Sequence, residues 1–223
     1  MTTTTPMPVV ILISGGGSNL QAIIDATTAG NCPINIRAVI SNRPDAKGLE
    51  RASAAGIETV VIDHKQFDGR DAFDQELMNR IDGYQPSLLV LAGFMRILTN
   101  QFVEHYAGRL LNIHPALLPD FPGLNTHERA LESGVKRHGA SVHFVTTEVD
   151  GGPIVLQAAV PVKTDATAKT LAASVLEQEH QIYPLVIKWY AENRLVLENN
   201  KPLLDKKELP STGLKYAEVQ KNQ

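Results

Sequence analysis

The fold is decided by one stretch near the start of the chain, VVILISGGGSN at residues 9–19. Residues 9–13 form an unbroken apolar run rich in β-branched side chains, which is typical of a strand buried on both faces. Three consecutive glycines follow, and Leu20, Ile23 and Ile24 then recur at helical spacing. The stretch therefore predicts a buried strand, a glycine-rich turn and a helix in succession.

The same alternation of strand and helix continues beyond this stretch. Strands are expected at residues 36–41, 59–63, 88–92 and 110–114, and helices at residues 47–55 and 70–84. Strands that alternate with helices imply right-handed crossovers. The pattern predicts an α/β fold with a doubly wound, Rossmann-like, mostly parallel sheet.

The pattern changes in the second half of the chain. Residues 141–146 and 154–162 both have the composition of strands, but only about seven residues separate them. A parallel crossover needs about a dozen residues or more, so this pair is predicted to be antiparallel and to lie at one edge of the sheet. A long helix is expected at residues 167–193, with Pro184 inside it. Proline removes a backbone donor, so a kink is expected there.

The domain organisation follows from these elements and from the composition of the two ends. A single domain is expected over residues 9–199, after a flexible lead at residues 1–8. Residues 200–223 are polar and rich in lysine, which predicts a tail that lies on the surface or is disordered.

The composition excludes several classes of protein. Cys32 is the single cysteine, which rules out an internal disulfide and, with no signal-peptide pattern, indicates a cytoplasmic setting. The apolar runs are too short to span a membrane. The formal net charge is −3 and basic residues do not cluster, which argues against nucleic-acid binding.

The glycine-rich turn at residues 14–19 is a candidate phosphate site. Glycines permit close approach of the backbone, and the start of the following helix presents N–H groups with a partial positive charge. The spacing matches neither a P-loop nor a dinucleotide motif, so the kind of phosphate stays open. The alternative is an ordinary tight turn in which Ser18 caps the helix.

The strand predicted at residues 110–114 carries two polar side chains on one face. Side chains alternate across a strand, so Asn112 and His114 point the same way, and Pro115 marks the end of the strand. In open α/β sheets, ligands bind beyond the carboxyl ends of the strands. The pair is therefore a candidate catalytic site, although it could instead tie down the loop at residues 115–126.

Asp150 lies in the turn between the two strands of the antiparallel pair. An Asp-Gly turn is common and needs no function. A carboxylate beside His114 would, however, hold the ring in one tautomer and favour the imidazolium. His143 could share a face with this site or be a satisfied half-buried residue. No cluster of histidine or cysteine predicts a metal site.

Four segments of the chain resemble the folate-dependent phosphoribosylglycinamide formyltransferases of purine synthesis. The segments are ISGGGSNLQ at residues 13–21, LAGFMRIL at 91–98, NIHPALLP at 112–119 and DGGP at 150–153. The NIHP and DGG segments are common to the wider formyltransferase superfamily. The Ser18-Asn19-Leu20 segment and FPGLNTH at residues 121–127 indicate this branch.

The resemblance implies a role for each segment. Gly17, Ser18 and Asn19 would hold the ribose phosphate of the acceptor, and Glu179 would meet its glycinamide end. Asn112, His114 and Asp150 would be catalytic. The co-substrate 10-formyltetrahydrofolate would be held by a set of residues from several segments: Arg70, Met95, Arg96, Ile97, Leu98, Asn112, Thr146, Thr147, Glu148, Val149 and Asp150. The expected partners are small molecules, with no metal, no nucleic acid and no membrane, and the oligomeric state stays open.

The mechanism implied is a direct transfer. The acceptor amine would attack the formyl carbon, and Asn112 and protonated His114 would stabilise the oxyanion, with Asp150 supporting the charge of His114. A formyltetrahydrofolate deformylase would use the same three residues but is expected to carry a further domain ahead of them. A methionyl-tRNA formyltransferase would need an added RNA-binding domain. A sensor of phosphorylated ligands would need only the glycine turn. The Leu118–Pro119 bond could be cis, although trans is the default.

Overall fold

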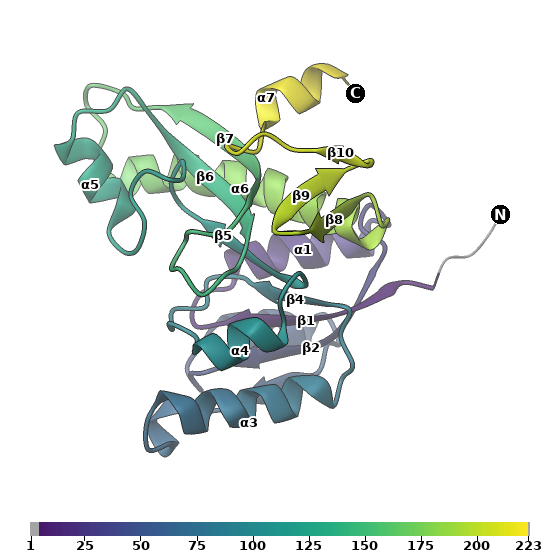
Figure 1. Cartoon of the computed structure of the whole chain (residues 1–223). Coiled ribbons are helices and arrows are strands. Elements are labelled where there is room, and N and C mark those ends of the chain that lie inside the picture. Colours follow the sequence, from purple (N-terminus) through teal and green to yellow (C-terminus); the bar gives the residue numbers. More distant parts are fainter. Residues whose placement is uncertain (1–4, 223) are drawn as a thin grey trace. The chain divides into compact units, whose positions relative to one another are not determined.

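The computed structural model describes residues 5–222 and divides into two compact units, Met1–Leu111 and Asn112–Gln223 (Figure 1). The division falls within strand β5 (Leu110–His114). Both units contribute to the region where the sequence predicts one domain, and that single domain stays a prediction. Residues 1–4 of the expected lead lie outside the described residues, and strand β1 begins at Met7, inside the lead expected over residues 1–8.

The first unit is built on parallel strands. They are β1 (Met7–Ile13), β2 (Ile34–Ser41), β3 (Thr59–Val61) and β4 (Leu88–Leu91), in the spatial order β4-β1-β2-β3. β1 pairs in parallel with both β2 and β4. Residues 9–13 are fully buried, because β1 is central and covered on both faces. The predicted strand, turn and helix order is confirmed here.

Helices connect these strands, and Figure 1 shows α1 on one side of them and α3 on the other. The helical elements are α1 (Ser18–Thr28), α2 (Gly48–Ala54), the 3₁₀ turn η1 (His64–Gln66), α3 (Arg70–Asp82) and α4 (Asn100–His105). α3 buries Phe73, Leu77 and Ile81, the apolar stripe of a surface helix. Helix α4 was not expected from the sequence, and its first turn is capped by the side chain of Thr99.

The second unit holds the antiparallel strands. Its main elements are the end of β5, α5 (Thr126–Glu132), β6 (Arg137–Phe144), β7 (Ile154–Pro161) and α6 (Ala168–Ala191). β6 and β7 pair antiparallel, as predicted, and the short strand β11 (Leu214–Lys215) joins β7 in parallel. α6 packs along β6 and β7 and contains Pro184 (Figure 1). The α/β class with an antiparallel edge pair is confirmed.

The segment after α6 has regular structure. It contains β8 (Leu195–Glu198), β9 (Lys201–Leu204), β10 (Lys207–Glu208), β11, α7 (Tyr216–Val219) and the 3₁₀ turn η2 (Gln220–Asn222). β8, β9 and β10 form a separate antiparallel sheet. The sequence offered a surface segment or a disordered one for residues 200–223, and residues 200–222 form these elements with most of their side chains exposed. Within residues 5–222, no helix is long and apolar enough to cross a bilayer.

Candidate active site

The end of β5 presents His114 and Asn112 from the same face of the strand. Leu111 and Ile113 point the other way and are buried among apolar side chains, which fixes the register of the strand. His114 is only 5% exposed, and Asn112 is half-buried. The alternation expected from the sequence therefore brings both polar side chains to one place.

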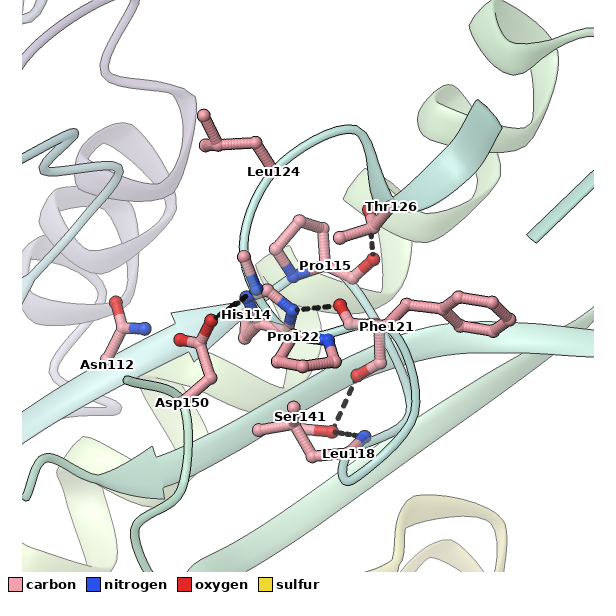
Figure 2. A network of polar contacts seen from close by, with 12 residues as sticks. Asn112, His114, Pro115, Leu118, Phe121, Pro122, Leu124, Thr126, Ser141 and Asp150 are labelled. Carbon is pink, nitrogen blue, oxygen red and sulfur yellow. Dashed lines mark hydrogen bonds and ion pairs between the residues drawn. The ribbon is translucent and has the colours of Figure 1, made fainter. Parts of the chain in front are cut away.

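Asp150 reaches His114. In the ion pair drawn in Figure 2, the Nδ1 atom of His114 lies 3.4 Å from Oδ2 of Asp150. The same carboxylate oxygen accepts a hydrogen bond from the backbone N–H of Gly123 at 2.8 Å. The Asp150 side chain is 12% exposed, so water screens its charge only weakly. The pairing that the sequence could not establish is thus present in the fold.

The second ring nitrogen of His114 also faces an acceptor. Nε2 lies 2.9 Å from the carbonyl oxygen of Phe121, so this nitrogen must donate (Figure 2). A neutral ring carries only one N–H, and it would leave a lone pair on Nδ1 directed at the carboxylate of Asp150. Only the imidazolium presents a hydrogen to both Phe121 and Asp150. Both ring nitrogens of His114 therefore face an oxygen atom of the protein.

Asn112 is oriented by His143, which lies on β6 and is 1% exposed. Nδ1 of His143 donates to the carbonyl oxygen of Phe144 at 2.9 Å. Burial lowers the pKa of His143, so the ring is neutral and its Nε2 carries a lone pair. That lone pair accepts from Nδ2 of Asn112 at 3.1 Å, which leaves the second amide hydrogen of Asn112 for another acceptor.

The contacts of His143 answer the question that the sequence left open. His143 is both buried and part of the site, because its Nε2 also lies 3.8 Å from Oδ1 of Asp150. Its alternation with Val142 and Phe144 was the only signal in the sequence. The parts played by the Phe121 carbonyl and the Gly123 N–H carried no such signal, because backbone groups are the same in every residue.

The loop at residues 115–126 carries both of these backbone groups. Its two ends are tied together, since the hydroxyl of Thr126 donates to the carbonyl oxygen of Pro115 at 2.8 Å (Figure 2). The Leu118–Pro119 bond within it is cis, so the trans default is wrong here. The loop is thus fixed near His114 as well as at its ends.

The glycine-rich turn lies in the first unit, between β1 and α1. Gly17 has φ of 70° and is the N-cap residue, so the expectation that Ser18 caps the helix is wrong. A Cβ atom on Gly17 would lie 2.6 Å from the Cα atom of Gly48, so the two backbones touch there. Gly15 and Gly16 are exposed, and Ser18 and Asn19 begin the helix. An exposed backbone turn at a helix start is a setting in which anions bind.

The segment at residues 95–98 is anchored at both ends within the first unit. The N–H of Met95 donates to the hydroxyl oxygen of Ser14 at 2.8 Å, and the N–H of Thr99 donates to Asp74 at 2.6 Å. Burial raises the pKa of Asp74. Between the anchors, Met95 and Ile97 are exposed apolar side chains, at 67% and 60%. Such a segment offers apolar contact area to a ligand.

The remaining residues that are predicted to bind the folate co-substrate lie at the start of α3, in the segment at residues 95–98 and in the turn after β6. Arg70 is exposed at the first position of α3, and the guanidinium of Arg96 lies over the ring of Phe73 at 4.7 Å. Thr147, Glu148 and Val149 are exposed, and Thr146 is half-buried. These four residues lead directly to Asp150, which links the turn to the site around His114.

Two further features bear on the site. Glu179 lies on α6 and is 6% exposed, so the helix holds it inside the second unit.

A cavity of about 540 Å³ in the first unit is lined by residues such as Ile34, Arg37 and Tyr84. It lies at the start of β2, whereas the glycine turn follows the other end of the parallel strand β1, and it contains none of the predicted site residues. The candidate active site is therefore placed at His114 and not at this cavity.

Comparisons with known proteins identify the family. The model of the family described as Formyl transferase matches residues 7–187. The chain belongs to the formyl transferase family. The phosphoribosylglycinamide formyltransferase of Escherichia coli is 56% identical over 207 residues, which are 93% of this chain and 98% of that protein. The human trifunctional purine biosynthetic protein adenosine-3 is 47% identical over 192 residues, which are 86% of this chain and 19% of that protein.

Solved structures of formyl transferases agree with the fold. The phosphoribosylglycinamide formyltransferase of Coxiella burnetii, in complex with CHES, is 52% identical with a TM-score of 0.91, over 95% of this chain and 99% of that one. The glycinamide ribonucleotide transformylase 1 of Symbiobacterium toebii is 46% identical with a TM-score of 0.87, over 91% of this chain and 95% of that one. The resemblance inferred from the four sequence segments is confirmed, and the deformylase and sensor alternatives are not favoured.

Formyl transferases of this family use 10-formyltetrahydrofolate as the formyl donor. Within residues 5–222, no group of three or more histidine, cysteine, aspartate or glutamate side chains has the arrangement of a metal site.

Proposed function

We propose that the chain transfers the formyl group of 10-formyltetrahydrofolate to the amine of N1-(5-phospho-D-ribosyl)glycinamide. The products are N2-formyl-N1-(5-phospho-D-ribosyl)glycinamide and tetrahydrofolate, and the reaction belongs to de novo purine (IMP) biosynthesis. The relatives named phosphoribosylglycinamide formyltransferase support the reaction. The observation that carries it is the pairing of His114 with Asp150 at the end of β5, beside Asn112.

The three side chains stabilise the charge that develops during transfer. When the acceptor amine attacks the formyl carbon, the formyl oxygen becomes an oxyanion. Asn112 offers the amide hydrogen that His143 does not use. His114 offers its Nδ1 hydrogen, because the 3.4 Å separation from Asp150 is longer than an ordinary N–H···O hydrogen bond. Donors of this kind lower the barrier of acyl transfer by several kcal/mol in total, about 2.7–4 kcal/mol for each.

Asp150 orients His114 and supports its charge during this step. The imidazolium stabilises the oxyanion more strongly than a neutral ring would, because a charged donor makes the stronger hydrogen bond. Because the amine attacks the formyl carbon directly, no covalent enzyme intermediate forms. The proton that the amine releases passes to the departing folate nitrogen. The C–N bond to the acceptor forms first, and the C–N bond to the folate breaks when the tetrahedral oxyanion collapses.

The acceptor is held by its two ends. The turn at Gly17, Ser18 and Asn19, which follows the exposed Gly15 and Gly16, binds the phosphate through backbone N–H groups at the start of α1. The carboxylate of Glu179 binds the glycinamide end. A phosphate at a helix start gains from the helix dipole as well as from hydrogen bonds, which favours a phosphorylated acceptor over an unmodified amine.

The donor is held by residues from several segments of the chain. The exposed side chains of Met95 and Ile97 give the folate ring system apolar contact area, and Arg70 gives its carboxylates a cation. Leu98 and Arg96 complete this segment. In the second unit, residues 146–149 bind the donor beside Asp150, and Asn112 contacts its formyl group.

The reaction is tested by following 10-formyltetrahydrofolate by absorbance, with and without phosphoribosylglycinamide. We expect turnover only when the phosphorylated amine is present, and mass spectrometry should then find the formylated acceptor. Turnover without the amine would instead identify a deformylase and would remove the phosphate role of the glycine turn. Ligand binding with no turnover under either condition would favour the sensor.

A further inference from the structure

We propose that Ser141 and Gln157 are positioning residues for His114, which act by holding the backbone of residues 116–118. Neither residue has a place in the chemistry described above, and both lie in the second unit with His114. The inference rests on the proposed function, because it assigns these residues a part in the same reaction.

Ser141 uses its hydroxyl both as donor and as acceptor. The hydroxyl donates to the carbonyl oxygen of Ala116 at 2.6 Å and accepts from the N–H of Leu118 at 3.0 Å (Figure 2). Ser141 is fully buried on β6. A buried hydroxyl costs about 1–3 kcal/mol when it lacks partners, so these two bonds are needed to keep it there. They also fix two backbone groups of the loop.

Gln157 completes the arrangement from the neighbouring strand. Ser141 and Gln157 are direct partners in the antiparallel register of β6 and β7, so their side chains lie on the same face. The Nε2 atom of Gln157 donates to the hydroxyl of Ser141 at 2.8 Å and to the carbonyl oxygen of Leu118 at 2.8 Å. The N–H and the carbonyl of Leu118 are therefore both held by this pair.

The backbone held in this way leads directly to the partners of His114. Ala116 is the second residue after His114, and its N–H bonds the carbonyl oxygen of His114 at 2.9 Å. Three residues beyond Leu118, the carbonyl of Phe121 accepts from His114, and the N–H of Gly123 then bonds Asp150. A shift at residues 116–118 would move the acceptor of His114 and the donor to Asp150 together.

Ser141 and Gln157 make these bonds to the backbone and need not touch the substrate. Their loss should therefore lower kcat and leave KM for the acceptor unchanged, because the phosphate-binding turn belongs to the first unit. A displacement of about 1 Å at a catalytic group costs on the order of a hundredfold in rate. A side chain that served stability alone would change the melting temperature without this selective loss of kcat.

The test uses two variants of the full-length chain, Ser141→Ala and Gln157→Glu. Gln157→Glu keeps the shape of the side chain but removes the donor, and it keeps the inference testable if Ser141→Ala folds poorly. Matched controls are Ser174→Ala, whose hydroxyl bonds only the carbonyl of Thr170 in the part of the chain described, and Gln75→Glu on the surface of α3. Ser141→Thr, which keeps the hydroxyl, should recover part of the lost rate.

Two readouts are compared at saturating donor: kcat and KM for phosphoribosylglycinamide, and hydrogen exchange of the peptide covering residues 116–124. We expect kcat to fall tenfold to a hundredfold, KM to change by less than threefold, and the peptide to exchange faster, in both variants and in neither control. Unchanged kcat, or a loss confined to KM, would overturn the inference. If the wild type transferred no formyl group, the proposed function would fail instead. Slow exchange of residues 116–124 retained in both variants would show that Ser141 and Gln157 do not hold this backbone, which would overturn the inference separately.

Discussion

At the scale of single residues, the site depends on how His114 and Asn112 are supplied with partners. His114 faces acceptors on both nitrogens, and Asn112 gives one amide hydrogen to His143. Asn112 keeps its second amide hydrogen for a reacting oxygen, and His114 offers its Nδ1 hydrogen, which lies in the 3.4 Å separation from Asp150. Asn112 and His114 are therefore needed for the hydrogens that they donate. Substitutions that keep the shape of the side chain but remove a donated hydrogen should be enough to remove activity.

Asn112→Asp should lower kcat on the order of 10²–10³-fold, because a carboxylate cannot donate to the oxyanion and repels it. KM for the acceptor should change little, since the phosphate is bound by the glycine turn. Steady-state kinetics with both substrates would check this. A variant that keeps half of the wild-type kcat would remove Asn112 from the mechanism.

Asp150→Asn should lower the rate on the order of 10²–10⁴-fold, in the range that proton-handling groups contribute. The amide cannot balance the charge of the imidazolium, although it can still accept from the N–H of Gly123. The measurement is the single-turnover rate at saturating substrates. Unimpaired turnover would show that His114 acts without a charged partner.

The sequence predicts the position of these residues but only part of their environment. Strand alternation placed Asn112 and His114 on one face, because that rule is local. The distance between His114 and Asp150 depends on how β5 and the turn after β6 come together, so no local pattern contained it. The roles of Phe121 and Gly123 depend on backbone atoms and could not be predicted from residue type.

At the scale of elements, the turn between β1 and α1 combines two requirements at Gly17. Its φ of 70° favours glycine, and its Cα atom lies against Gly48. Three adjacent glycines indicated close approach in the sequence, but the partner, 31 positions further on, had no signal. Gly48 is the first residue of α2, so this contact joins two helix starts.

Gly17→Ala should destabilise the protein by about 1–3 kcal/mol, through strain at positive φ and the clash with Gly48. It should also raise KM for phosphoribosylglycinamide, because the turn must shift. Chemical denaturation and steady-state kinetics would measure the two effects. Ala29→Gly, at the far end of α1, is a control that should leave KM unchanged. An unaltered KM in Gly17→Ala would argue against the turn as the phosphate site.

The end of the chain shows what composition does not predict at this scale. Residues 200–222 are polar and rich in lysine, yet they form strands and short helical turns. Arg194 and Asp205 form a two-bonded ion pair, with both N–O distances at 2.8 Å, across the hairpin of β8 and β9. Such pairing depends on residues distant in the sequence, so a prediction from local composition had no access to it.

At the scale of the whole molecule, a buried histidine links stability to pH. His138 is 1% exposed, and its Nε2 lies 3.2 Å from Nδ1 of His127. Burial lowers the pKa of His138 from 6.5 to about 4. The unfolded chain binds the proton more readily, so the contribution of His138 to stability is complete above about pH 6.5 and is lost as the pH falls toward about 4.

The free energy of unfolding should therefore decrease between about pH 6.5 and about pH 4. His138→Gln should make this decrease shallower, because glutamine does not titrate. Urea denaturation at a series of pH values would measure both slopes. Equal slopes in the two proteins would mean that His138 takes no part in the acid sensitivity.

The overall fold was the part that sequence alone predicted best. Alternating strands and helices and one short connection between β6 and β7 sufficed for a mostly parallel sheet with an antiparallel pair. The division at Leu111 carried no signal, because it falls inside a strand and not in a linker of distinct composition. The formyl transferase family matches residues 7–187, on both sides of that division.

The most direct test of the central claim is the single-turnover rate of formyl transfer in His114→Ala, with phosphoribosylglycinamide binding measured by calorimetry in the same preparation. His105→Ala is the control, since His105 is an exposed histidine on α4 that pairs with Asp82. The account predicts a loss of at least about a hundredfold in rate, with acceptor binding retained and the control unaffected. Transfer in His114→Ala within a few-fold of the wild-type rate would contradict it.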